Sequence, residues 1–400
     1  MSIDTKLDPL KILMIAPEPF FQPRGTPISI FFRLKTLSEL GHKVDLLTYP
    51  IGEDRAFRNV RILRTSAFPG IRAIKIGPSA AKLPLDFMLL WKTLARMTAE
   101  RYDLVFSHEE AGWWGTLLAR IWKIPHLYDM HSSLPQQLDN FEFTRSALIK
   151  GTFIWLERFV LKRSGAVITI CADLQNIVKR EGFGRKTILL ENFLEFDHSD
   201  FGPADFTAVR KKYAPDGEKI ALYAGNFQSY QGVGRLVEAF ARLKDEPAVL
   251  LLVGEKGGKL RAMKDFVASL GISGKVKFTG QVSPEEVPLY IGASDALVSP
   301  RLSGTNTPLK IYSFLKAGKP VVATRLWTHT QVLDDRIALL TGTSAGAMAE
   351  GIRAALFTEA GPRTAAAAKD FADREYSTAR YKEKLTTALG RAIESKKNDH

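Results

Sequence analysis

One stretch of this sequence collects side chains suited to holding an anion. It reads SPRLSGTNTPLKIYSF (299–314) and has no carboxylate. Its polar and cationic side chains are Arg301, Asn306, Thr307 and Lys310. Cationic, amide and hydroxyl groups suit a diphosphate, whereas magnesium and calcium prefer carboxylate oxygens. The stretch therefore predicts an anion site and no metal.

The same stretch also contains a helix start. Pro308 suits a first helical position, and Thr307 is then the expected N-cap. Lys310 would fall in the first turn, where a cation is unfavourable by about 0.3–1 kcal/mol. A bound anion would remove that cost. A solvated lysine is the alternative interpretation.

A second candidate site lies in LYDMHSSL (127–134), where His131 ends an apolar run. Asp129 precedes it by two residues and would share its face of a strand. His108 and Glu109 end the preceding apolar run. Polar groups at strand ends favour a site, although a structural histidine remains the alternative.

These residues depend on strands that alternate with helical segments along almost the whole chain. Thirteen short apolar runs are the expected strands: 11–17, 43–49, 59–65, 103–109, 125–131, 166–170, 187–193, 219–227, 248–255, 275–281, 296–301, 320–325 and 337–342. Such alternation predicts an α/β protein with two doubly wound parallel sheets. We expect domains at 1–197 and 218–375, joined by a linker at 198–217. Ligands of such sheets bind beyond the carboxyl ends of the strands.

Glycines follow several of these runs. Gly25 and Thr26 follow the first strand and precede a helix, whose free N–H groups suit a phosphate. Other residues at expected strand ends of the second domain are Gly225, Gly254, Lys256 and Gly280. Glycine spacing alone is a weak signal, and plain strand–helix turns are the alternative.

Composition narrows the class of protein. The chain has 400 residues, a net charge of +13 and one cysteine, Cys171. It shows neither a signal-peptide layout nor a membrane-spanning run, so we expect a cytoplasmic protein. The charge favours nucleotides, nucleic acid or an anionic membrane. No nucleic-acid motif is evident, so nucleic acid is not the expected partner.

The segment 55–96 is rich in both basic and apolar side chains. It holds nine basic residues against one acid, Asp86. This pattern is typical of a peripheral surface that contacts anionic lipid, here at the inner face of the cytoplasmic membrane. A core-facing helix with a solvated basic face is the alternative.

Together these motifs resemble the retaining GT-B glycosyltransferases of family 4. The resemblance is strongest in YAGNFQSYQGVGRLVEAFARL (223–243) and PLKIYSFLKAGKPVVAT (308–324). It implies two Rossmann-like domains, a nucleotide-sugar donor in the C-terminal domain, and no metal. A final helix, about 376–400, would complete the N-terminal domain. UDP is the expected nucleotide, with GDP open, and the acceptor would be a lipid, lipid-linked or polysaccharide hydroxyl.

The resemblance also implies residue roles. Gly25 would approach the donor phosphates, His131 would contact the donor sugar, and His108 and Glu109 would lie on the acceptor side. Gly225 begins the loop after the first strand of the donor domain.

Three positions depart from the family pattern. Asn226 and Gln231 stand where the family has an arginine and a lysine, and Ser313 replaces a ribose-binding glutamate. Arg301 and Lys310 could supply the missing positive charge. A nucleotide-sugar-binding protein without activity is the alternative.

Overall fold

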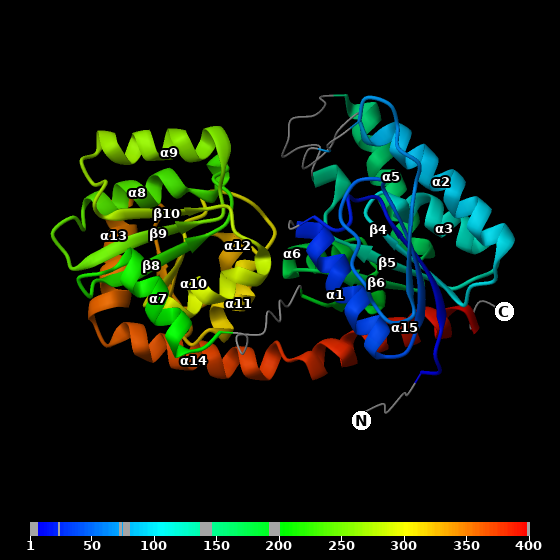
Figure 1. Cartoon of the computed structure of the whole chain (residues 1–400). Helices are drawn as coiled ribbons and strands as arrows, with labels where there is room; N and C mark the ends of the chain where they lie inside the picture. Colours follow the sequence, from blue (N-terminus) through cyan, green and yellow to red (C-terminus); the bar gives the residue numbers. More distant parts are fainter. Residues whose placement is uncertain are drawn as a thin grey trace. The chain divides into compact units, whose positions relative to one another are not determined.

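The computed structural model describes residues 7–22, 25–71, 74, 81–136, 146–191 and 201–397. The chain forms two compact units. Unit 1 comprises Met1–Asn192 and Ala379–His400, and unit 2 comprises Phe193–Thr378. The chain therefore crosses between the units twice, after Asn192 and after Thr378 (Figure 1).

Unit 1 is built on a seven-stranded parallel sheet in the order β3-β2-β1-β4-β5-β6-β7. Its strands are β1 Lys11–Ala16, β2 Lys43–Thr48, β3 Val60–Arg64, β4 Leu104–His108, β5 His126–Met130, β6 Ala166–Thr169 and β7 Thr187–Leu189. Strands β4, β5 and β6 are buried at every residue. Burial on both faces explains why these strands lack an alternating polar pattern, and the polar residues that they contain, such as His108 and Asp129, are buried as well.

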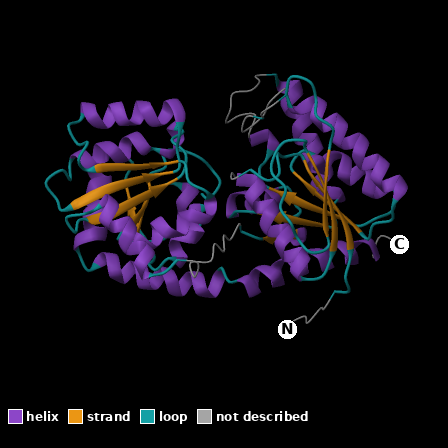
Figure 2. Ribbon diagram, viewed as in Figure 1, coloured by secondary structure: helices purple, strands orange, loops and turns teal. Residues whose placement is uncertain are grey.

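Helices pack against both faces of this sheet (Figure 2). They are α1 Gly25–Glu39, α2 Lys82–Ala99, α3 Ala111–Ile121, α5 Ala147–Arg163, α6 Ala172–Arg180, the short η1 Gly184–Lys186 and α15 Thr378–Lys397. Helices α2, α3 and α5 are neighbours in one layer. Helices α1 and α15 meet through an ion pair in which Lys382 contacts Glu39 at 2.8 Å. The final helix thus completes unit 1.

Unit 2 repeats the same plan with a six-stranded parallel sheet in the order β10-β9-β8-β11-β12-β13. Its strands are β8 Lys219–Ala224, β9 Ala248–Val253, β10 Val276–Gly280, β11 Ala296–Ser299, β12 Val321–Thr324 and β13 Leu339–Thr341. Its helices are α7 Pro203–Tyr213, η3 Ser229–Gln231, α8 Val233–Ala241, α9 Gly257–Ser269, η4 Pro284–Glu286, α10 Val287–Ala293, α11 Lys310–Lys316, α12 Trp327–Thr330, α13 Ala345–Phe357 and α14 Ala360–Glu375.

Each expected strand is present, and the predicted fold class of two doubly wound parallel sheets is confirmed. In each sheet the order of the strands reverses once, between β1 and β4 in unit 1 and between β8 and β11 in unit 2. Ligands of such sheets bind at this switch point, beyond the carboxyl ends of the strands. The two switch points are therefore the places to search.

The segment expected as a linker, 198–217, differs from that expectation where it is described. It contains α7, which packs against α10 and belongs to unit 2. Arg210 of α7 donates to the Asp295 carboxylate at 2.9 Å, which fixes the helix to the sheet. Residues 198–200 lie outside the described residues. No described helix is long and apolar enough to cross a membrane.

Candidate active site

Two basic side chains, Arg301 and Lys310, lie at the switch point of the unit 2 sheet. Gly225 directly follows β8, and Arg301 follows β11, the strand beside it. The Lys310 Nζ atom lies 3.9 Å from the ring centroid of Tyr223, the geometry of a cation–π contact. A Cβ on Gly225 would lie 3.0 Å from this Nζ atom. Gly225, at φ +146°, therefore leaves the space that the lysine needs.

The Lys310 Nζ atom is buried and has no hydrogen-bond partner among the described residues. Burial, and then the charge of Arg301, hold its pKa well below the ordinary value. An ammonium group without a counter-ion is costly to bury. A bound anion would supply the missing partner and restore the charge.

Arg301 is the second cation of this site. Its Nη1 donates to the Asn306 carbonyl at 2.7 Å and to the Thr328 hydroxyl at 2.8 Å. Its guanidinium lies 5.2 Å from the ring centroid of Tyr230. In the part of the chain that the structure describes, neither Arg301 nor Lys310 pairs with a carboxylate. Two basic side chains without a carboxylate partner among the described residues are the composition expected of an anion site.

The predicted glycines bring neighbouring strand ends together. Gly225 N–H donates to the Val253 carbonyl at 2.9 Å, and Gly254 N–H donates to the Gly280 carbonyl at 3.0 Å. A Cβ on Gly254 would approach the Gly225 carbonyl oxygen to 3.2 Å. Gly254 thus allows close backbone packing, whereas at Gly280 the φ of +80°, and not a close neighbour among the described residues, favours glycine. Lys256 is exposed at the start of α9.

The loop after β8 carries no charge where the family has two cations. The Asn226 amide oxygen accepts from Gln228 N–H at 3.3 Å, and the Asn226 carbonyl accepts from the Tyr223 hydroxyl at 2.6 Å. Gln231 is buried. Tyr230 anchors the loop because its carbonyl accepts from Leu302 N–H at 2.9 Å. The loop is therefore bound to the segment that carries Arg301.

The expected helix start at Thr307 and Pro308 is wrong. Helix α11 begins at Lys310, and the Thr307 hydroxyl is buried with no hydrogen-bond partner among the described residues. The preceding segment is held by tertiary contacts, since the Asn306 carbonyl accepts from both Arg301 and Thr328. Ser313 is buried within α11. The candidate anion site is therefore indicated by its basic side chains and not by a capped helix N-terminus.

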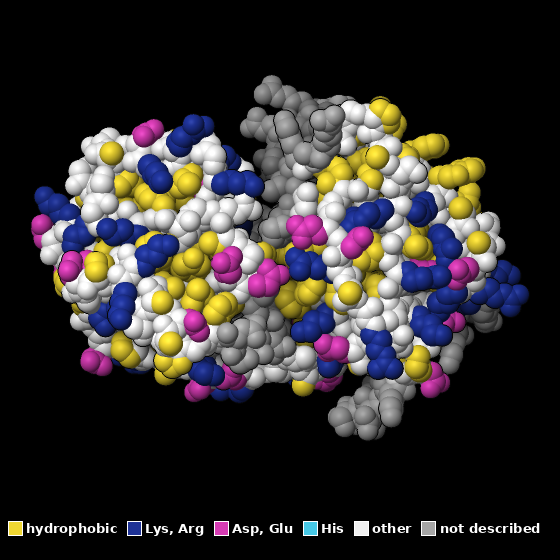
Figure 3. Space-filling view, in the orientation of Figure 1, with side chains coloured by type: hydrophobic (Ala, Val, Ile, Leu, Met, Phe, Trp, Pro, Cys, Tyr) yellow, Lys and Arg dark blue, Asp and Glu magenta, His cyan; other side chains and the backbone are white. Residues whose placement is uncertain are grey.

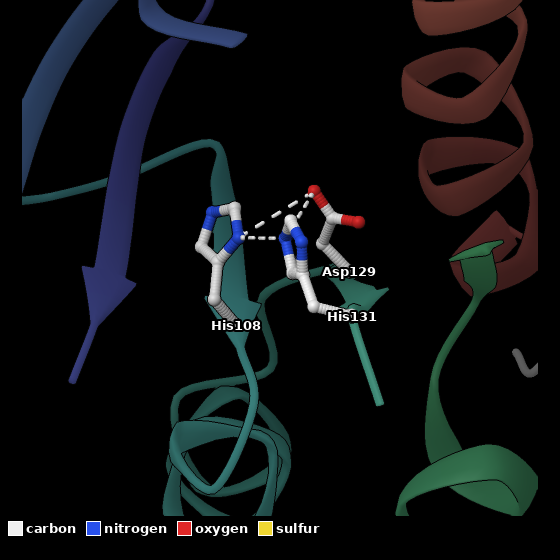
Figure 4. Close-up of side chains that lie close together, drawn as sticks. All are labelled: His108, Asp129 and His131. Atoms are coloured by element: carbon white, nitrogen blue, oxygen red, sulfur yellow. Dashed lines mark hydrogen bonds and ion pairs between the residues drawn. The ribbon is translucent and has the colours of Figure 1, made fainter. Parts of the chain in front are cut away.

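In unit 1, three buried side chains gather at the ends of β4 and β5. The Nδ1 atom of His108 lies 3.2 Å from the Nε2 atom of His131 and 3.4 Å from Asp129 Oδ2. The same oxygen lies 3.3 Å from His131 Nε2. Figure 4 shows the two rings and the carboxylate converging on one point. The structure thus brings together His131, His108 and Asp129, as their strand-end positions predict.

The charges of this cluster can be assigned from its surroundings. Burial alone would raise the pKa of Asp129, but Arg33 and the two histidines hold it far below its usual range. Burial lowers the pKa of His108 to about 3, so this ring is neutral. Burial also opposes charge on His131, yet Asp129 and Glu109 outweigh it and raise its pKa. A protonated His131 can therefore donate to Asp129 or to the neutral His108 ring.

The three donor atoms are close enough to share a metal ion. However, Asp129 Oδ2 already accepts from Arg33 Nε at 3.0 Å. A guanidinium cation at this distance repels a second cation on the same oxygen. The donor set therefore suits a shared proton at Oδ2, and a metal would have to bind the other carboxylate oxygen, Oδ1, which has no hydrogen-bond partner among the described residues. The expectation of a metal-free site stays a prediction.

Glu109 lies beside this cluster in an unusual backbone conformation. Its φ of +48° falls in the left-handed region, which is uncommon for a residue other than glycine. Its carboxylate accepts from the Ser132 hydroxyl at 2.6 Å. Burial raises its pKa to about 7, although His131 opposes the shift. Strained backbone and a perturbed carboxyl are both typical of functional sites.

The predicted phosphate contact at Gly25 and Thr26 is only partly described. Gly25 is the first residue of α1, and a Cβ there would meet no atom of the described residues within 4 Å. Residues 23–24 lie outside the described residues. The open space around Gly25 is compatible with a ligand, and its role stays a prediction.

Sequence reasoning missed four residues that complete these sites: Arg33, Tyr223, Tyr230 and Tyr381. Arg33 stands inside the apolar stretch ISIFFRLKTL (28–37) of α1 and is fully buried. A lone arginine among apolar neighbours was the signal that could have identified it.

The segment 55–96 presents less free charge than its composition indicated. Four of its basic side chains pair with acids that lie outside the segment. These pairs are Arg61–Asp45, Arg64–Asp54, Lys82–Glu110 and Arg96–Asp45. Arg72 and Lys75 lie outside the described residues. The expectation of a strongly basic face is therefore corrected for these four positions.

Two Rossmann-like units, each built on a doubly wound parallel sheet, define a two-domain α/β protein of the kind that binds ligands at the switch points of its sheets. Residues 205–371 match the family of glycosyl transferases group 1, and residues 34–192 match the glycosyl transferase 4-like domain. The chain belongs to the family 4-like glycosyltransferases of GT-B fold, which use a nucleotide-sugar donor.

Relatives and solved structures agree with this assignment. The chain is 25% identical over 324 residues to the alpha-monoglucosyldiacylglycerol synthase of Streptococcus pneumoniae, covering 78% of this chain and 71% of the relative. It is also 25% identical over 336 residues to the mannosylfructose-phosphate synthase of Agrobacterium fabrum, covering 75% and 71%. Anabaena Alr3699/HepE, solved with UDP, has a similar fold with a TM-score of 0.75 at 16% identity, covering 95% and 99%.

Proposed function

We propose that the protein is a retaining hexosyltransferase that moves a sugar from a UDP-sugar to a hydroxyl of a lipid or lipid-linked acceptor. The observation that carries the proposal is the pair of basic side chains, Arg301 and Lys310, which lie at the switch point of unit 2 with no carboxylate partner among the described residues. A nucleoside diphosphate leaving group supplies the negative charge that these cations lack.

In the proposed reaction, the bond between the anomeric carbon and the diphosphate oxygen breaks with oxocarbenium-like character. The acceptor oxygen forms a bond to the same carbon from the same face, and its proton passes to a donor phosphate oxygen. Lys310 and Arg301 stabilise the departing diphosphate. His131 contacts the donor sugar, and Glu109 faces the acceptor. The protein acts by positioning and by stabilising charge, not as a nucleophile.

UDP is our choice of nucleotide. The structure of Anabaena Alr3699/HepE in complex with UDP and glucose supports this choice, and that protein covers 95% of the present chain at a TM-score of 0.74. A thermal-shift screen with UDP-, GDP- and ADP-sugars tests it. We expect stabilisation by UDP-sugars, abolished in Lys310→Met and retained in the control Lys244→Met, whose side chain is exposed.

A second candidate function is nucleotide-sugar binding without transfer. It is favoured by Asn226, Gln231 and Ser313, which replace residues that bind the donor in the family pattern. Release of UDP from a UDP-sugar in the presence of membrane extract, with product configuration read by NMR, separates the two candidates. Binding without UDP release would contradict the transferase proposal. An inverted product would contradict the retaining mechanism.

A lipid acceptor is supported by exposed apolar side chains on the α2–α3–α5 layer. Leu83, Phe87 and Trp91 are 69%, 70% and 67% exposed and are spaced four residues apart on α2. Helices α3 and α5 add further exposed apolar residues: Leu117, Ile121, Leu148, Ile149, Ile154 and Trp155. Figure 3 shows apolar side chains gathered over this part of unit 1. The name of the pneumococcal relative also refers to a diacylglycerol lipid.

We propose that this apolar face binds the inner surface of the cytoplasmic membrane, with exposed basic residues such as Arg120 and Lys123 beside it. Sedimentation with phosphatidylglycerol vesicles tests this. Phe87→Ser with Trp91→Ser should reduce binding, whereas Leu270→Ser, an exposed apolar residue of unit 2, should not. Equal binding of all variants, or DNA binding without vesicle binding, would contradict the proposal.

A further inference from the structure

The Arg33 side chain is among the largest fully buried side chains of the protein. Its Nε donates to Asp129 Oδ2 at 3.0 Å, and its Nη2 donates to the Leu190 carbonyl at 3.2 Å. Its Nη1 donates to the Tyr381 hydroxyl of α15. A buried arginine is stable only when its donors are satisfied, and here each of the three nitrogens has a different partner.

Two of these partners lie where the chain crosses between the units. Leu190 is two residues before Asn192, the last residue of unit 1 before the first crossing. Tyr381 is two residues after Ala379, the first residue of unit 1 after the second crossing. The Arg33 side chain therefore contacts the chain in unit 1 next to both crossings.

An ion pair links the same two places directly. Lys384 donates to the Glu191 carboxylate at 2.7 Å, and both side chains are largely buried. Glu191 follows Leu190, and Lys384 lies one helical turn after Tyr381. The two crossings are thus fixed to each other as well as to Arg33.

The third partner of Arg33 leads to the candidate site. Asp129 Oδ2, which accepts from Arg33, also lies 3.3 Å from His131 Nε2. The other titratable groups that act on His131 are His108 and Glu109 at the end of β4. A displacement of Arg33 would therefore change how much of the Asp129 charge is available to His131.

We propose that Arg33 is a positioning residue that ties the orientation of His131, through Asp129, to the two chain crossings at Leu190 and Tyr381. This rests on the proposed function only for the role of His131 in transfer. The alternative is a purely structural role, in which Arg33 neutralises Asp129 and Tyr381 fills space around α15. The two accounts differ in what happens at His131 when Tyr381 is altered.

The experiment is an NMR titration of isotope-labelled histidine in the full chain, which has seven histidines and needs no donor. His131→Ala identifies the His131 resonance. In Tyr381→Phe, Arg33 loses one acceptor and holds Asp129 less firmly, so the pKa of His131 should rise by about half a pH unit or more. Arg33→Met removes a cation that opposes charge on His131, so it should produce a larger rise.

The matched control is Tyr102→Phe. The Tyr102 hydroxyl also donates to an aspartate that arginines contact, Asp45, but it lies beyond the opposite end of β4. We expect its loss to leave the titration of His131 unchanged. If Tyr381→Phe behaves like Tyr102→Phe, the proposal is overturned, whether or not Arg33→Met folds. If the shift occurs but no UDP-sugar is turned over by the wild-type protein, the proposed function fails while the positioning role stands.

Discussion

Replacing Lys310 by methionine should stabilise the free protein and weaken nucleotide binding. Methionine keeps the length of the side chain but removes its charge and its unpaired donors. The Lys310 Nζ atom is buried over the Tyr223 ring without a hydrogen-bond partner in the described chain. A buried, unsatisfied polar group costs about 1–3 kcal/mol. We therefore expect Lys310→Met to raise the free energy of unfolding by about 1–2 kcal/mol in the absence of ligand.

The effect on binding has the opposite sign. A hydrogen bond to a charged group contributes about 1.5–3 kcal/mol. At about 1.4 kcal/mol for each factor of ten, the loss of the contact with a diphosphate should weaken UDP binding by about 10- to 150-fold. A residue that is unfavourable in the free protein and favourable in the complex is what an anion site requires.

The pH dependence provides a second signature. Because the pKa of Lys310 is lowered in the folded protein, the unfolded chain binds more protons between that depressed value and about 10.5. Stability from this group therefore rises with pH across this window, and Lys310→Met should lack the rise. UDP binding should take up a proton in the same window and weaken as pH increases.

Urea unfolding measured at several pH values, together with calorimetric titration with UDP, tests all three effects. Lys244→Met, at an exposed position, is the control and should change neither quantity appreciably. The reasoning would be refuted if Lys310→Met destabilised the free protein and bound UDP as tightly as the wild type. Such a result would make Lys310 a structural residue, and the anion site would have to rest on Arg301 alone.

Three further expectations concern neighbouring groups. Gly225→Ala should weaken UDP binding in calorimetry, because a Cβ would lie 3.0 Å from Lys310 Nζ and the φ of +146° disfavours alanine. Glu109→Gln should stabilise the protein at pH 8 but much less at pH 4.5 in urea unfolding, since the pKa of Glu109 is raised to about 7 and ionising it above that value opposes folding. Prolonged treatment with a chelator should leave UDP release unchanged, because Arg33 already neutralises the Asp129 carboxylate; loss of activity that zinc restores would contradict this.

The fold was predictable because its signals are local. Strands buried on both faces are mostly apolar, so the run at 248–255 identified β9 directly, and the shorter apolar segment 104–106 identified β4. The sequence placed His108 and His131 at strand ends, and the structure adds that β4 and β5 are adjacent, so the two side chains lie at the same edge of the sheet. The strand assignments themselves needed no knowledge of distant contacts.

The sequence-based predictions were wrong at positions where contacts with residues distant in sequence determine the local structure or the free charge. Helix α11 begins at Lys310 because Arg301 and Thr328 hold the preceding segment in a non-helical conformation, and Thr328 lies about twenty residues further along the chain. The charge of 55–96 was overestimated because Asp45, Asp54 and Glu110, which pair with its basic residues, fall outside that window. Counting charge within a segment cannot detect partners from neighbouring strands and helices.

Arg33 shows the same limit most clearly and gives it a functional meaning. Its partner Tyr381 is 348 residues away in sequence, so no local pattern connects the two side chains. A buried arginine with three different acceptors constrains all of them, because moving any one leaves a buried donor unpaired at a cost of about 1–3 kcal/mol. The same energetic cost therefore opposes movement of Asp129 and of the two chain crossings at Leu190 and Tyr381. A departure from the family pattern in the donor loop can thus coexist with transfer activity, provided that Lys310 binds the diphosphate and Arg33 keeps His131 in place.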